Sequence, residues 1–192
     1  MRNNEYLKVG SKMEHIYNGL NRQDLKLYSQ VGGDPNPIHY DDDIAQREGL
    51  KGANAQYIYP TGFIFNLFKK FFNYSRSFRV LELGIYQQEL IYSNKHLFYS
   101  SYWRCGDSLY SKATLSKIEG NNYYFDIIQT LFRPIKVTDN EGIIIKRFEA
   151  LKKGYGDGKD FEKDLKTRMI SGNRILHYNE RILLTGYIII KI

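Results

Sequence analysis

The chain has 192 residues, enough for one domain with a sizeable core, and its 42% hydrophobic and 26% charged residues exclude an intrinsically disordered protein. The net charge of +7 suits an anionic partner, but no Lys/Arg block is dense enough for a nucleic-acid-binding arm. We therefore expect no nucleic acid as partner. No apolar run approaches the ~20 residues of a membrane span, so we expect no membrane as partner either.

The cysteine and histidine residues indicate neither a disulfide nor a metal site. A lone Cys105 cannot form an intramolecular disulfide, which favours a reducing compartment, and it has no obvious base beside it to activate it as a nucleophile. The histidines stand without cysteine partners at metal-ligand spacing: His15, His39, His96 and His177. We therefore expect no metal or other cofactor. The N-terminal residues lack the apolar stretch of a signal peptide, which predicts a cytoplasmic protein.

Helices are predicted in the first third of the chain. Leu25, Tyr28 and Val31 recur at helical spacing, and Gly32-Gly33 ends that helix. A short helix follows in DDDIAQREGLKG, closed by Gly49 or Gly52. The apolar stretch 54–72 could be a strand because of its aromatic residues. Its length and the basic pair Lys69-Lys70 favour a helix, with a kink or an irregular first turn near Pro60–Gly62.

Strands are predicted from Phe78 onward, where segments rich in β-branched and aromatic residues alternate with turn-forming residues. The predicted strands lie within residues 78–92, 95–104, 108–119, 123–135 and 142–153. Helices followed by a run of antiparallel strands predict an α+β domain, in which a curved sheet wraps one long buried helix.

The tail after residue 153 is predicted to be a C-terminal extension of unknown role, separate from a domain that spans residues 1–153. Residues 154–160 read as a linker, 161–170 as a weak helix and 181–192 as an apolar strand. Such a terminal strand more often packs on a sheet or a partner subunit than takes part in chemistry.

The loop between residues 29 and 43, SQVGGDPNPIHYDDD, holds the candidate catalytic residues. Its two prolines forbid a regular helix and reduce the entropy that is lost when the loop is fixed. A rigid turn could bring Asp34 and His39 to one spot, where a carboxylate and an imidazole could hold a water molecule and transfer protons. The structural alternative is a capped turn between two helices, in which Asp41, Asp42 or Asp43 is the N-cap.

This loop resembles the signature of the MaoC-like, (R)-specific enoyl-CoA hydratase family. The residues that fit the family pattern position by position are Gly33, Asp34, Asn36, Pro37, Ile38, His39 and Asp41. The later segment CGDSLYSKATLSKI resembles the strand that follows the central helix in that family. The resemblance covers about residues 5–153.

The resemblance implies a hot-dog fold, usually paired into dimers, and an acyl-CoA thioester as substrate. It implies that Asp34 and His39 share the water that adds to trans-2-enoyl-CoA to give (R)-3-hydroxyacyl-CoA. It implies loop-supporting roles for Gly33, Asn36 and Pro37. CoA phosphates would suit basic residues that follow the central helix, of which the candidates are Lys69, Lys70, Arg76 and Arg79.

One departure leaves the activity open. Where the family has an Ala-His-Gly-like stretch whose Gly N–H polarises the thioester carbonyl, this chain has Gln56 and Tyr57. The backbone N–H of Tyr57 can still act as the oxyanion donor, but its bulk could block the acyl pocket. Three readings follow: a hydratase or dehydratase, favoured by Asp34 and His39; a non-catalytic hot-dog subunit that binds acyl-CoA or supports an active partner; and another activity, such as a thioesterase. Under the first two readings, we expect the protein to form a homodimer or a hetero-oligomer with another hot-dog subunit.

Overall fold

The computed structural model describes residues 7–50, 52–56, 58–72, 77–87, 90–93, 96–99, 103–148 and 165–192. Within them the elements follow in this order: β1 (Lys12–Tyr17), α1 (Arg22–Val31), the 3-10 helix η1 (Pro37–His39), α2 (Asp42–Arg47), α3 (Tyr59–Phe71), β2 (Arg79–Gln87), β3 (Leu90–Ser93), β4 (His96–Tyr99), β5 (Ser108–Glu119), β6 (Asn122–Thr138), β7 (Ile144–Arg147), β8 (Lys166–Ile170) and β9 (Arg174–Lys191).

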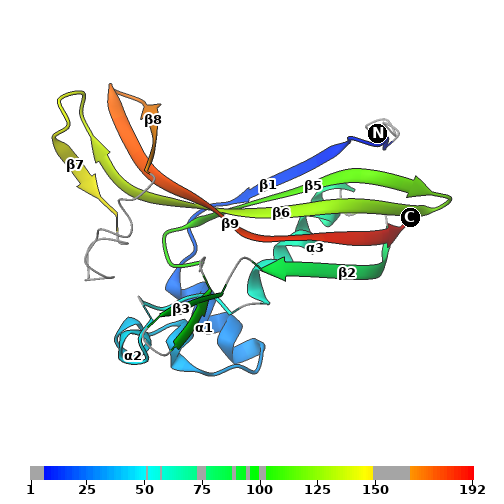
Figure 1. Ribbon diagram of the computed structural model, residues 1–192, viewed down its shortest axis with the longest axis horizontal. Coiled ribbons are helices and arrows are strands. Elements are labelled where there is room, and N and C mark those ends of the chain that lie inside the picture. Colours follow the sequence, from blue (N-terminus) through cyan, green and yellow to red (C-terminus); the bar gives the residue numbers. More distant parts are fainter. Residues whose placement is uncertain are drawn as a thin grey trace.

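The main sheet is antiparallel, and its strand order is β1-β5-β6-β9-β2. Strand β7 pairs with the end of β6 and β8 pairs with the start of β9, so the sheet continues into an arm at the upper left of Figure 1. Strands β3 and β4 form a separate hairpin. Helix α3 lies against the sheet, while α1 and α2 lie below its middle (Figure 1). A sheet wrapped around one helix confirms the predicted α+β class.

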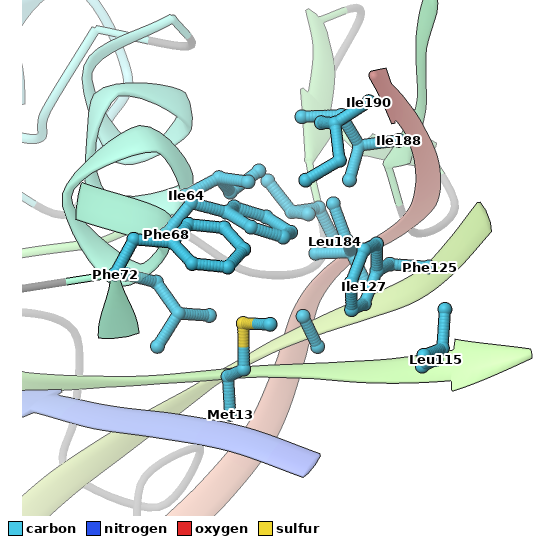
Figure 2. Packing of buried hydrophobic residues seen from close by; sticks show 12 residues of the cluster. Met13, Ile64, Phe68, Phe72, Leu115, Phe125, Ile127, Leu184, Ile188 and Ile190 are labelled. Carbon is cyan, nitrogen blue, oxygen red and sulfur yellow. The ribbon is translucent and has the colours of Figure 1, made fainter. Parts of the chain in front are cut away.

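The core lies between α3 and the sheet because both present apolar residues at the matching period. On α3, Ile64, Leu67 and Phe68 recur at spacings of three and one, on one helix face, and all are buried. Burial alternates along the first eight residues of β5, as expected for a strand with one face on the core. Figure 2 shows the helix side chains directed toward those of the sheet. The buried members of this cluster are Met13, Ile64, Leu67, Phe68, Phe72, Ala113, Leu115, Phe125, Ile127, Leu184, Ile188 and Ile190.

Helix α3 begins later than the sequence predicted, and Pro60 therefore causes no kink. The helix starts at Tyr59, which places Pro60 in the first turn, where a proline needs no backbone partner. Residues 52–56, which the sequence analysis partly assigned to the helix, are not helical. Asn54 forms a β-bridge with Arg104 instead, and the Ala55 N–H donates to the Trp103 carbonyl at 2.8 Å.

Three other secondary-structure predictions need correction. The stretch 78–92 contains two strands, β2 and β3, and β1 was not foreseen. The weak helix predicted over 161–170 is wrong for its described part, because residues 166–170 form strand β8. All five residues of β8 pair with β9, so an available strand partner overrides a weak local preference for helix.

The described part of the tail, residues 165–192, does not form a separate extension, and this corrects the boundary placed at residue 153. Strand β9 pairs with β6 along one side and with β2 along the other, which makes it an interior strand of the main sheet. Leu184, Ile188 and Ile190 of β9 belong to the core below α3. The apolar end of the chain is therefore packed in the sheet, which is one of the two placements expected for it.

Candidate active site

The candidate catalytic loop is shaped by local backbone chemistry between α1 and α2. Gly33 has φ +72°, in the left-handed region that other residues avoid, and this turns the chain out of α1. Asn36 caps the 3-10 helix η1, since its side-chain oxygen accepts from the Ile38 N–H at 3.2 Å. Pro37 is the first residue of η1 and His39 the last. Asp41 caps α2, which settles which of the three aspartates is the N-cap.

The loop brings Asp34 and His39 together. The His39 Nε2 atom lies 3.0 Å from the Asp34 Oδ2 atom. The His39 side chain is 12% exposed, whereas that of Asp34 is 47% exposed. One member of the pair is thus held within the fold while the other remains open to water or to a ligand.

The other ring nitrogen of His39 is held by the segment that precedes α3. Its Nδ1 atom lies 2.9 Å from the backbone oxygen of Asn54. A carbonyl oxygen can only accept, so Nδ1 carries the hydrogen in this contact. The Nε2 atom faces the Asp34 carboxyl group at hydrogen-bond distance. An imidazole and a carboxyl group, two side chains that commonly transfer protons in catalysis, therefore lie side by side.

A buried ion pair lies next to the Asn54 segment, in the later stretch CGDS that the sequence analysis compared with the family strand. Asp107 is 1% exposed and forms a two-point contact with Arg133, Nε to Oδ1 at 2.7 Å and Nη2 to Oδ2 at 2.5 Å. The same carboxylate accepts from the Arg104 N–H at 3.0 Å, and Arg104 is the bridge partner of Asn54. This network supports the backbone to which His39 is bonded.

The residue proposed as oxyanion donor, Tyr57, lies outside the described residues. Its neighbour Gln56 is buried, and its side-chain amide donates to the Ser29 hydroxyl of α1 at 2.6 Å. Of the candidate CoA-binding cations, Arg76 also lies outside the described residues. Lys69 and Lys70 are in the last turn of α3, at the opposite end of that helix from Asn54.

Aromatic residues pack beside the site, in a second buried cluster. Tyr59 stacks on Trp103 with ring centroids 5.4 Å apart, and Tyr17 packs edge-on against Trp103 at 5.6 Å. Burial raises the pKa of both phenols, and for Tyr17 a hydrogen bond to Asp24 raises it further. These tyrosines therefore stay neutral at physiological pH, as hydrogen-bonding and packing groups.

The comparisons with known proteins agree with this architecture. Residues 8–145 match the family described as "FAS1-like, dehydratase domain region". The chain belongs to this family. The MaoC-like family resemblance expected from the loop is thereby confirmed, and no curated protein matches. Among the described residues, no helix is long and apolar enough to cross a membrane.

Solved structures confirm the hot-dog fold. The ChsH1-ChsH2 complex from Mycobacterium tuberculosis aligns with a TM-score of 0.59 at 10% identity, covering 97% of this chain and 99% of the other. The (R)-hydratase from A. caviae involved in PHA biosynthesis gives 0.56 at 10% identity, covering 98% of each chain. R-Hydratase PhaJ1 from Pseudomonas aeruginosa gives 0.56 at 15% identity, covering 96% of this chain and 81% of that one. Because the alignments span nearly the whole chain, the likeness includes β9.

Asp34 and His39 meet as the sequence predicted, but the sequence did not reveal the groups that hold them. The Asn54 contact uses a backbone oxygen, which no side-chain pattern reveals. Asp42 was considered only as a helix cap, yet it is buried and bonds to the Ala53 N–H at 2.9 Å. The sequence contained one signal of another role for Asp42. Three aspartates stand in a row, and only one of them can be the N-cap of the helix.

Proposed function

We propose that this protein is an acyl-thioester hydratase or dehydratase that interconverts trans-2-enoyl-CoA and (R)-3-hydroxyacyl-CoA. The observation that carries the proposal is the contact between His39 Nε2 and Asp34 Oδ2, made while the Asn54 carbonyl fixes the opposite ring nitrogen. The Asn54 contact fixes the orientation of the ring, so that Nε2 faces Asp34. This is the arrangement that general acid–base addition of water requires.

In the hydration direction, a water molecule held by the pair attacks C3 of the enoyl thioester. The C3–O bond forms as the electron pair of the C2=C3 bond moves to C2, and the pair takes a proton from the water. C2 receives a proton from the pair, so H and OH are added overall and the two side chains return to their starting state. The reverse sequence expels water and restores the double bond.

The developing negative charge on the thioester oxygen needs a hydrogen-bond donor. We propose the backbone N–H of Tyr57 for this role, because it lies three residues after Asn54 and two before the start of α3. Backbone donors aimed at a developing oxyanion stabilise the transition state substantially in water-excluded sites. The Tyr57 side chain would narrow the acyl channel, which favours short acyl chains.

The family and fold support this chemistry. The family is a dehydratase region, and two of the aligned structures are named (R)-hydratases. These likenesses support the general activity, hydration or dehydration of an acyl thioester. The CoA thioester as substrate and the (R) configuration of the product are more specific parts of the proposal.

We also propose that the protein works as a homodimer or with a second hot-dog subunit. Strands β1 and β2 end the strand order of the main sheet, and exposed sheet edges are normally paired or shielded. One aligned structure, ChsH1-ChsH2, is a complex of two differently named chains.

The direct test is an absorbance assay of the purified protein with short and medium trans-2-enoyl-CoA substrates, followed by chiral analysis of the product. Loss of the enoyl absorbance together with formation of (R)-3-hydroxyacyl-CoA is the expected result. Binding of acyl-CoA without turnover would support the non-catalytic subunit instead. Neither binding nor turnover with any enoyl thioester would overturn the proposal.

A further inference from the structure

Asp42 is a buried carboxylate that joins three separate segments of the chain. It is the first residue of α2 and is 8% exposed. Its Oδ1 atom accepts from the backbone N–H of Ala53 at 2.9 Å, and its Oδ2 atom pairs with the guanidinium of Arg22, the first residue of α1. The carboxylate therefore connects the starts of α1 and α2 with the segment before α3.

These three segments are the ones that define the geometry of His39. The catalytic loop runs from the end of α1 to the start of α2, so the Arg22–Asp42 pair links the two helices that flank it. Ala53, which Asp42 holds, is followed directly by Asn54, whose carbonyl oxygen accepts from His39 Nδ1. The Asp42 contact and the His39 contact are therefore made by adjacent residues of the backbone.

We propose that Asp42, paired with Arg22, is a positioning residue that fixes the His39 ring and its tautomer through the Ala53–Asn54 backbone. The inference rests on the proposed function for its effect on catalysis, but the structural effect on His39 can be measured without turnover. Asp42 touches no reacting atom in this scheme. It acts by holding the carbonyl oxygen that holds the imidazole.

The position requires a carboxylate rather than an amide. The Ala53 N–H and the Arg22 guanidinium are both donors, and the Asp42 carboxylate has an acceptor oxygen for each. An asparagine of the same shape has one acceptor oxygen, and its NH₂ group would face a second donor. Asp42→Asn should therefore release either Arg22 or Ala53 with almost no change in volume.

The experiment compares Asp42→Asn with Asp43→Asn in the full-length protein. Asp43 is the matched control, because it is the next residue in the first turn of α2, carries the same charge and is exposed. The first readout is the ¹⁵N NMR signal of the ring nitrogens in histidine-labelled protein, with His39→Gln identifying the His39 signals. The second is kcat and KM with trans-2-butenoyl-CoA.

In the unmodified protein and in Asp43→Asn, the His39 signals should show a protonated, hydrogen-bonded Nδ1. In Asp42→Asn they should shift or broaden. The value of kcat should fall by about 10²-fold with little change in KM, as expected when a reacting group is displaced by about 1 Å. Arg22→Lys, which keeps the charge, should lie closer to the unmodified protein than Arg22→Gln does.

Unchanged His39 signals and unchanged kcat in folded Asp42→Asn would overturn the inference, even if that variant melted at a lower temperature. If Asp42→Asn does not fold, Arg22→Gln supplies the same test, and the same null result there would overturn it. A shifted His39 signal in a protein that hydrates no enoyl thioester would support the positioning role while rejecting the proposed function.

Discussion

The Nδ1 atom of His39 lies 2.9 Å from the backbone oxygen of Asn54, a residue 15 positions further along the chain. This contact joins the loop after α1 to the extended segment before α3. It places the ring hydrogen on Nδ1, because a carbonyl oxygen can only accept, and it leaves Nε2 facing Asp34. The candidate site is thus assembled from a local turn and one longer-range backbone contact.

Replacing either member of the pair should abolish most hydration. We expect Asp34→Asn and His39→Gln each to lower kcat by about 10²–10⁴-fold, the scale for a positioned acid or base. Asp34 is 47% exposed and neither residue belongs to the apolar core clusters, so both variants should retain the circular dichroism spectrum of the folded protein. Near-normal turnover by either variant would show that the pair is not catalytic.

Breaking the buried pair between Asp107 and Arg133 should cost far more stability than breaking a surface pair. Arg133→Met leaves the 1% exposed Asp107 carboxylate without its two-point partner, and we expect a loss of about 3–5 kcal/mol in the free energy of unfolding by urea. Glu180→Gln is the control, since Glu180 pairs with Lys166 at the surface. Its loss should be about 0–1 kcal/mol. Equal losses in the two variants would contradict the structure.

Gly186 lies where β9 and β2 approach too closely for a side chain. A Cβ atom at this position would lie 2.2 Å from the backbone oxygen of Gly84. Because a backbone atom must then move, Gly186→Ala should lower the free energy of unfolding by about 1–3 kcal/mol. Gly62→Ala in α3 is the control for a glycine with free space around it, because a Cβ atom there would meet no atom within 4 Å. That variant should gain up to about 1 kcal/mol from helix propensity. A stabilised Gly186→Ala would rule out this strand pairing.

Two histidines should make the fold less stable in mild acid. Burial and the charge of Lys70 lower the pKa of His15, and burial and the charge of Lys136 lower that of His177. Both therefore stay neutral in the folded protein at pH values where the unfolded chain, with a pKa near 6.5, already binds protons. The unfolded state takes up more protons, so the free energy of unfolding should fall as the pH drops below 6.5.

The measurement is the urea midpoint at about pH 7.5 and 5.5, in the unmodified protein and in His15→Gln and His177→Gln. Each substitution removes one group that gains a proton on unfolding, so each variant should lose less stability between the two pH values. An equal or larger loss in both variants would place the pH dependence elsewhere.

The sequence determined the parts of this protein that depend on local chemistry. The turn residues between 32 and 41 fix a bent loop, and the order of Asp34, Asn36, Pro37 and His39 within it identified the family. Apolar spacing identified α1, and the length and basic end of the following apolar stretch favoured the helix that is α3. Strand β5 has the same ends that turn residues predicted for it, Ser108 and Glu119. Each of these signals lies within about a dozen neighbouring residues, the range over which periodicity and turn chemistry act.

Only the tertiary structure decided what depends on partners far along the chain. Strand β8 forms because it pairs with β9, and β9 is an interior strand because it pairs with β6 and β2. Local preference cannot anticipate these pairings. Helix α3 starts at Tyr59 because the residues before it bond to Trp103 and Arg104. The tautomer of His39 depends on a backbone oxygen, and the burial of Asp42 depends on the meeting of α1, α2 and Ala53. A backbone group has the same chemistry at almost every position, so only the fold shows which one is used.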